Sequence, residues 1–159
     1  MASDCLHSSE IISRYHHVFV HLSETKNLTA IEDHLATISN LRKVPNQGHD
    51  VQALLRLYQG AFEVLRARDS INFFMKNTYL KIGLDRMQGI DVDLFQGDSS
   101  IYTHLLLVRG LSNAEVPLRF GRTQHALRDL KTALQEPCFT IVDAKTQQKT
   151  QRFMQEKME

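Results

Sequence analysis

Histidine is the residue type in this chain that is best suited to metal chemistry, because eight are present and three cluster near the N-terminus. His17 and His21 lie four residues apart, so on a helix their rings would share one face and could hold a divalent ion. A stable zinc site needs a third and usually a fourth protein ligand, and Glu24 is the one candidate nearby. We interpret the pair as part of a solvated polar face and expect no metal and no other cofactor.

Motifs for covalent catalysis and for nucleotide binding are incomplete. The sequence Gly97-Asp98-Ser99-Ser100 superficially resembles a loop that presents a nucleophilic serine, but no glycine follows the serine. Capping of a helix N-terminus explains the same residues. The chain also lacks Gly-x-Gly-x-x-Gly and Gly-Lys-Ser/Thr, the sequences that cradle phosphates. We therefore expect no catalytic residues and no enzymatic activity.

Arginines give the strongest candidate for a binding surface. They lie between residues 104 and 131, where Phe120 stands between two of them. Arginines with an aromatic neighbour could contact the phosphates and bases of RNA or DNA, or an acidic protein surface, or simply pair with acidic neighbours in this chain. Because the basic excess of the stretch is modest, we favour a protein over nucleic acid. The residues predicted to contact a partner are Arg109, Arg119, Phe120, Arg122 and Arg128.

Composition places the chain among ordinary globular proteins. It has 159 residues, of which 42% are hydrophobic and 23% charged, and its formal net charge is +1. A length of this order predicts one domain with a substantial core. The near-zero net charge gives no general attraction to nucleic acid or to an acidic membrane, and no apolar run is long enough to span a bilayer. We expect no membrane association.

The two cysteines, Cys5 and Cys138, are far apart in the sequence. A secreted domain held together by disulfides would show more cysteines at closer spacing, so we expect both thiols to be reduced. The first residues also lack the basic and apolar regions of a signal peptide. These features favour the cytoplasm or the nucleus.

Apolar residues recur at helical spacing through most of the chain. In the first such segment, Ile11, Tyr15 and Phe19 fall in one sector at 100° per residue, with Arg14 and His17 opposite. Between 71 and 87 the apolar residues surround most of the helix, which is typical of a central, buried element. We therefore expect this segment to be the most buried. Six helices are predicted, over about 9–22, 29–44, 51–68, 71–87, 101–111 and 123–135.

The predicted fold is all-α, a single compact bundle of about six helices. It occupies residues 1–142, with an extended loop at 90–97. Residues 143–159 are rich in Gln, Lys and Glu and should form a polar C-terminal helix or a flexible tail. Whether the helices over 51–68 and 71–87 are separate or one bent helix is left open by the sequence.

Residues 8–68, with the run DVQALLRLY at 50–58, resemble the three-helix heterodimerisation modules of scaffold proteins. The resemblance covers less than half of the chain and implies a protein–protein module without assigning any residue a role. We predict a non-enzymatic helical interaction or adaptor domain that binds another protein or a second copy of itself. The first three helices would face the partner. The alternative is a nucleic-acid-associated protein that uses the stretch from Arg109 to Arg128.

Overall fold

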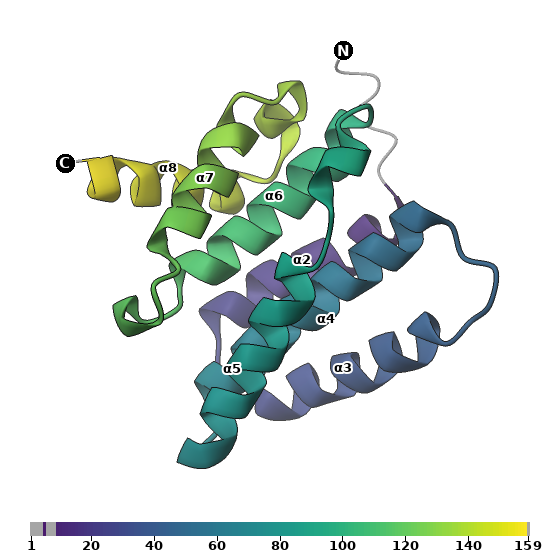
Figure 1. The fold of residues 1–159 in the computed structure, drawn as a ribbon, viewed down its shortest axis with the longest axis vertical. Coiled ribbons are helices and arrows are strands. Elements are labelled where there is room, and N and C mark those ends of the chain that lie inside the picture. The colour runs from purple at the N-terminus through teal and green to yellow at the C-terminus, as the bar shows by residue number, and fades with distance from the viewer. Residues whose placement is uncertain (1–4, 6–8, 159) are drawn as a thin grey trace. The chain divides into compact units, whose positions relative to one another are not determined.

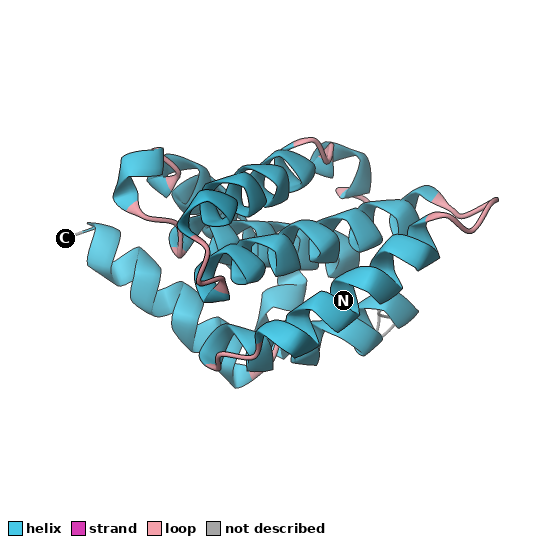
Figure 2. Ribbon diagram, turned by 90° about the horizontal axis from the view of Figure 1, so that it is seen from below, coloured by secondary structure: helices cyan, strands magenta, loops and turns pink. Residues whose placement is uncertain are grey.

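A computed structural model describes residue 5 and residues 9–158, and every regular element in this part of the chain is helical (Figures 1 and 2). The all-α prediction is confirmed, and the expected helices are present with ends shifted by at most a few residues. Within the described residues, no helix combines the length and the apolar character needed to cross a bilayer. The α-helices are α2 (Glu10–Glu24), α3 (Leu28–Arg42), α4 (His49–Asp69), α5 (Phe73–Gln88), α6 (Ser99–Ala114), α7 (Thr123–Leu134) and α8 (Ala144–Met158). Short 3₁₀ turns are η1 (Val92–Phe95), η2 (Leu118–Phe120) and η3 (Pro137–Ile141).

Side-chain caps explain where several helices begin. Ser9 Oγ accepts a hydrogen bond from the amide of Ile11 at 3.0 Å, and Asp98 Oδ1 accepts one from Ile101 at 3.2 Å, as the sequence predicted. Helix α3 begins one residue before the expected Thr29, because Asn27 supplies the cap. Its side-chain oxygen accepts from Ala30 at 3.1 Å.

The residue contacts of the chain divide it into two compact units. The first, called here the α2–α5 unit, comprises Ser9–Asp91. The second, the α6–α8 unit, comprises Val92–Glu159 together with the N-terminal segment that contains Cys5. Helices α4 and α5 are separate, because α4 ends at Asp69 and Asn72 caps the start of α5.

Helix α4 is the centre of the α2–α5 unit, with α2, α3 and α5 all packed against it. Twelve of its 21 residues are buried. Aromatic rings fill the space on one side: Tyr58 lies 5.9 Å from Tyr15 and 6.3 Å from Phe62, between ring centroids. His34 of α3 stacks on Phe62 at 5.8 Å. These rings supply much of the apolar surface that the unit removes from water.

Glycines allow α4 and α5 to pack with their backbones in contact. A Cβ atom at Gly83 would lie 2.6 Å from the carbonyl oxygen of Gly60, and one at Gly60 would lie 2.8 Å from that of Gly83. Real Cβ atoms do not approach a carbonyl oxygen so closely. The glycine pair therefore sets the distance between the two helices. Nothing in the sequence indicated that these two glycines would meet.

The expectation that residues 71–87 are the most buried segment is wrong. Only four of the 16 residues of α5 are buried, and Phe74 is 83% exposed, although Leu80 is buried as expected. The all-round apolar pattern suggested a helix enclosed by others, whereas within its unit α5 packs mainly against α4. The most buried helices are α4 and α6.

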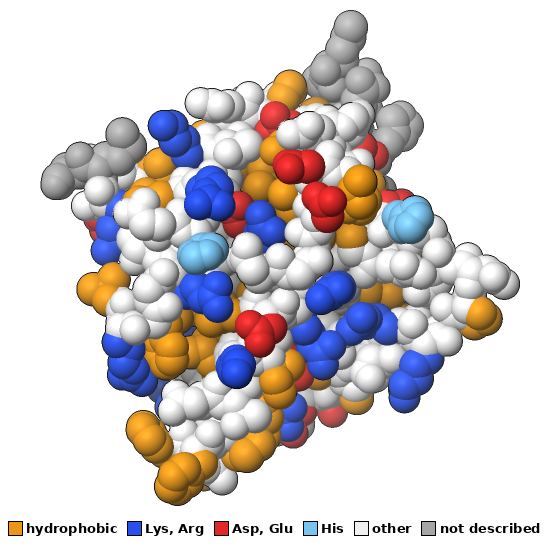
Figure 3. Space-filling view, in the orientation of Figure 1, with side chains coloured by type: hydrophobic (Ala, Val, Ile, Leu, Met, Phe, Trp, Pro, Cys, Tyr) orange, Lys and Arg blue, Asp and Glu red, His pale blue; other side chains and the backbone are white. Residues whose placement is uncertain are grey.

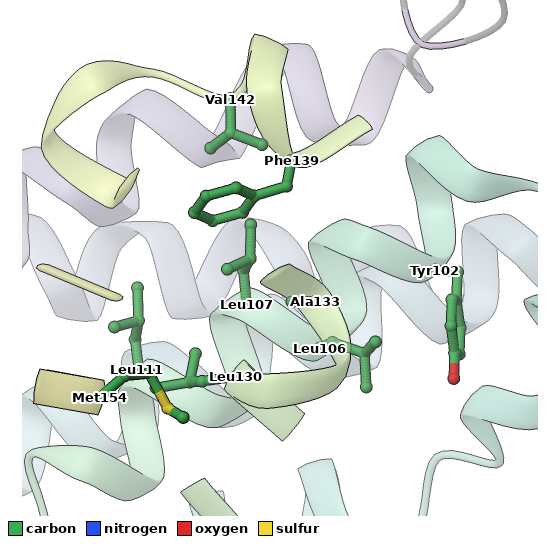
Figure 4. Packing of buried hydrophobic residues seen from close by; sticks show 9 residues of the cluster. All are labelled: Tyr102, Leu106, Leu107, Leu111, Leu130, Ala133, Phe139, Val142 and Met154. Carbon is green, nitrogen blue, oxygen red and sulfur yellow. The ribbon is translucent and has the colours of Figure 1, made fainter. Parts of the chain in front are cut away.

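Helix α6 is the centre of the other unit, and 13 of its 16 residues are buried. Helices α7 and α8 and the turns η1 and η3 pack against it. The sequence predicted either a polar helix or a flexible tail for the C-terminal residues, and the structure shows a helix, α8. Its Thr150 and Met154 are buried. Figure 4 shows the core that these elements enclose, made of Tyr102, Leu106, Leu107, Leu111, Leu130, Ala133, Phe139, Val142 and Met154.

The expectation that both cysteines are reduced is also contradicted. Cys5 and Cys138 form a disulfide, with their Cα atoms 5.3 Å apart. The two residues are separated by 133 positions, so their spacing in the sequence carried no sign of their proximity. Cys138 lies in η3, which belongs to the same unit as Cys5.

Candidate interaction surfaces

Arg109, the first of the predicted contact residues, is buried within the α6–α8 unit. Its Nε donates to Asp129 Oδ2 at 2.6 Å and its Nη2 to Asp129 Oδ1 at 2.8 Å. This two-pronged ion pair joins α6 to α7 and satisfies the charges of both side chains. We therefore leave Arg109 out of the proposed contact surface.

The other predicted contact residues lie on a turn and on α7. Arg119 and Phe120 belong to η2, where the Arg119 guanidinium lies 4.9 Å from the centre of the Phe120 ring. Gly121 follows with a φ of 68°, a left-handed conformation that suits glycine, and ends the turn. Arg122 is half-buried at the start of α7, and Arg128 is exposed on that helix.

A second group of arginines, which the sequence did not reveal, lies in the α2–α5 unit. Arg42, Arg56 and Arg86, the arginine cluster, come from α3, α4 and α5 respectively. Arg56 Nε donates to the backbone oxygen of Arg86 at 2.8 Å, and Arg42 Nη1 donates to Gln59 Oε1 at 2.5 Å. Figure 3 shows Lys and Arg side chains gathered over α4, between α5 and α3.

The charges of this cluster act on one another. Burial lowers the pKa of Arg42, and the positive charges of Arg86 and Arg56 lower it further. No carboxylate in the described part of the chain forms an ion pair with Arg42, Arg56 or Arg86. The cluster is thus a group of positive charges without an ion-pair partner among the described residues, and only the tertiary structure assembles it.

The charge of Arg86 also acts on the carboxylate of Glu63 in α4, which is only 8% exposed. Its Oε2 lies 3.8 Å from Arg66 Nη1, and the guanidinium of Arg66 stacks on the ring of Tyr79 at 3.9 Å. Burial raises the pKa of Glu63, although Arg66 and Arg86 lower it. Glu63 therefore forms its ion pair with Arg66. Its negative charge acts on the arginine cluster only at longer range, by attracting Arg86.

An exposed apolar group lies where α5 begins. Ile71, Phe73 and Phe74, the apolar tip, are 99%, 67% and 83% exposed. The two phenylalanine rings meet edge to face with centroids 6.2 Å apart. Asn72, which lies between Ile71 and Phe73 in the sequence, caps the helix by accepting from the amides of Phe74 and Met75. Apolar side chains gather at the free end of α5 in Figure 3, below the label in Figure 1.

The grooves and the metal-binding side chains of the described residues are weak candidates for a ligand-binding or metal site. A groove between α6 and α8, lined by Leu111, Ala114, Arg152 and Phe153, encloses about 230 Å³ and is wide open to solvent. Small-molecule pockets are usually larger and more enclosed. His17 and His21 are exposed on α2, and no three His, Cys, Asp or Glu side chains of the described residues gather as ligands.

Comparisons with known proteins add no relative: no family model matches the sequence, no curated protein is similar to it, and no solved structure matches its fold. The resemblance of residues 8–68 to scaffold-protein heterodimerisation modules therefore gains no support. The function has to be argued from the surfaces described above.

Proposed function

We propose that this chain is a non-enzymatic helical interaction domain that binds another protein through the apolar tip. The observation that carries the proposal is the exposure of three large apolar side chains within four residues, at 71, 73 and 74. Single exposed apolar residues are common, whereas a contiguous group of them is typical of a site that a partner covers. Aromatic side chains are also the usual anchors of protein interfaces.

The base of the apolar tip is held firmly, which favours its use as an anchor. Just before it, Arg68 Nη1 donates to the carbonyl oxygen of Ser23 and its Nη2 to that of Leu22, both at 2.8 Å. Arg68 also pairs with Asp69, whose carboxylate accepts from the backbone of Asn27. These bonds tie the end of α4 to α2 and α3, so a partner would bind the tip without first ordering its support.

Arg119, Phe120, Arg122 and Arg128 belong to the proposal as a second contact region, suited to acidic side chains of the partner. Charged side chains of this kind act mainly on the rate of association. The partner's groove for the tip should therefore supply most of the affinity.

The proposal is tested by a double substitution, Phe73→Ser with Phe74→Ser, in the full chain. Proteins that co-purify with the unchanged chain should be lost from the variant, and any self-association seen by light scattering should also be lost. Both rings are exposed, so the free energy of unfolding should change by no more than about 0.5 kcal/mol per site. The exposed pair Thr37→Ser with Thr78→Ser is the matched control. Unchanged binding and association in the double variant would refute the role of the tip.

Nucleic-acid binding by the basic turn is the alternative. Reversing the charge of Arg119 and Arg122 together tests it without disturbing a core, because one side chain is exposed and the other half-buried. If they contact phosphates, affinity for RNA or DNA should fall with salt at a slope of roughly 0.7–0.9 per contact in logarithmic units. Submicromolar binding at physiological salt, abolished by the double change, would favour this alternative over a protein partner.

A further inference from the structure

Three arginines from three different helices meet on one face of the α2–α5 unit without a carboxylate partner among the described residues. We propose that the arginine cluster, Arg42, Arg56 and Arg86, is a binding site for a phosphate group, either free phosphate or a phosphate monoester. The site is distinct from the apolar tip, which lies at the opposite end of α5 from Arg86.

The cluster is held in place by hydrogen bonds that leave donors available. A guanidinium has five N–H donors. Arg42 uses Nη1 on Gln59, and Arg56 uses Nε on the backbone of Arg86, so each retains further donors. Arg86 Nε is buried and has no hydrogen-bond acceptor among the described residues. An oxyanion would supply acceptors to side chains that these bonds already hold in part, which lowers the entropic cost of binding.

Charge favours a phosphate over the carboxylate of an acidic side chain. The three positive charges repel one another, and Glu63, which attracts Arg86, is itself paired with Arg66 at 3.8 Å. A phosphate monoester carries about −1.5 to −2 charges near neutral pH and three strong acceptor oxygens. A single carboxylate carries one negative charge and would leave most of the repulsion among the three arginines uncompensated. Arginine forks also match the geometry of phosphate oxygens well.

Gly89 offers a test that removes no charge. It ends α5 with a φ of −74° and a ψ of −6°, a conformation that alanine adopts without strain. A Cβ atom at this position would collide with Arg56 Nη2, the mobile end of a side chain, and would otherwise meet little. Gly89→Ala should therefore displace the Arg56 guanidinium while the helices stay as they are.

The experiment titrates the full chain with inorganic phosphate and with phosphoserine by calorimetry, at an ionic strength held constant with sodium chloride. We expect saturable binding that weakens at least about tenfold in Gly89→Ala and in Arg42→Gln. Phosphate should also raise the midpoint of thermal unfolding of the unchanged chain, because a ligand of the folded state stabilises it. Arg152→Gln, which removes an exposed arginine of α8 in the other unit, is the matched control and should bind normally.

The possible outcomes distinguish free phosphate from a phosphate monoester, and both from failure of the proposal. Tighter binding of phosphoserine would identify a monoester as the ligand, and equal binding would identify free phosphate. The proposal is overturned if phosphate acts no more strongly than chloride, if acetate binds as well as phosphate, or if Arg152→Gln loses as much affinity as Arg42→Gln. Circular dichroism of each variant shows that it is folded. The double change at Phe73 and Phe74 should leave phosphate binding intact, so the two proposals can fail separately.

Discussion

At the scale of single residues, burial decides what each charged side chain can do. Arg109 and Arg128 both looked available in the sequence, but Arg109 is paired with Asp129 inside the α6–α8 unit and Arg128 is exposed. Removing one partner of a buried pair leaves the other charge without compensation.

Asp129→Ala should accordingly lower the free energy of unfolding by roughly 3–5 kcal/mol. Urea unfolding followed by circular dichroism measures the loss. Arg128→Ala on the same helix is the control and should stay within about 0.5 kcal/mol of the unchanged chain. A loss for Asp129→Ala of the same size as the control would show that the pair contributes little.

Glu63 should make stability depend on pH. Burial raises its pKa in the folded state above the usual value near 4.5, so folded chains hold the proton more strongly than unfolded ones. Its contribution to stability is therefore complete below about pH 4.5 and is lost as the pH rises through the raised pKa. Glu63→Gln should remove this dependence and raise stability near pH 7. Unfolding in urea across this pH range tests it, with exposed Glu156→Gln as control. A variant less stable near pH 7 would mean that pairing with Arg66 outweighs burial.

At the scale of helices, packing depends on how closely two backbones can approach. Alanine normally stabilises a helix relative to glycine by roughly 0.5–1 kcal/mol. Gly83→Ala should have the opposite effect, because the new methyl group would meet the backbone of Gly60 and push α5 away from α4. We expect a loss of about 1–3 kcal/mol, as is usual for an overpacked contact.

Thermal or urea unfolding measures this loss. Gly97→Ala is the control, because a Cβ atom there would meet nothing within 4 Å. If Gly83→Ala were as stable as Gly97→Ala, the result would contradict the close packing of α4 against α5.

At the scale of the whole molecule, the Cys5–Cys138 disulfide closes a loop across 133 positions. Such a bond stabilises mainly by restricting the unfolded chain, and the effect grows with loop length. Treatment with a reductant should therefore lower the free energy of unfolding by about 2–4 kcal/mol. The double variant Cys5→Ser with Cys138→Ser should be insensitive to the reductant. Two free thiols in the untreated protein, measured by alkylation, would contradict the bond.

The same measurement bears on where the protein works. Disulfides persist in oxidising compartments and are rare in the cytoplasm and nucleus. Alkylation of the thiols in intact cells would show which state the protein holds there. Oxidised cysteines in cells would count against the expected cytoplasmic or nuclear location.

The helices and many of their ends follow from the amino-acid sequence alone. Helix formation depends on neighbours within about four residues, so periodic apolar residues and local caps such as Ser9 and Asp98 predict it well. The sequence does not determine whether α4 and α5 are separate, because Asp69 and Ser70 fit either a helix cap or a continuous helix.

Which surfaces are covered and which charges meet depends on how the helices pack. The apolar pattern of α5 could not show that α4 would cover a single side of it and leave Phe73 and Phe74 exposed. Arg42, Arg56 and Arg86 are distant in the sequence, and so are Cys5 and Cys138. Burial, ion pairing and disulfide formation depend on residues that folding brings together from far apart, and a single sequence contains no local sign of those contacts.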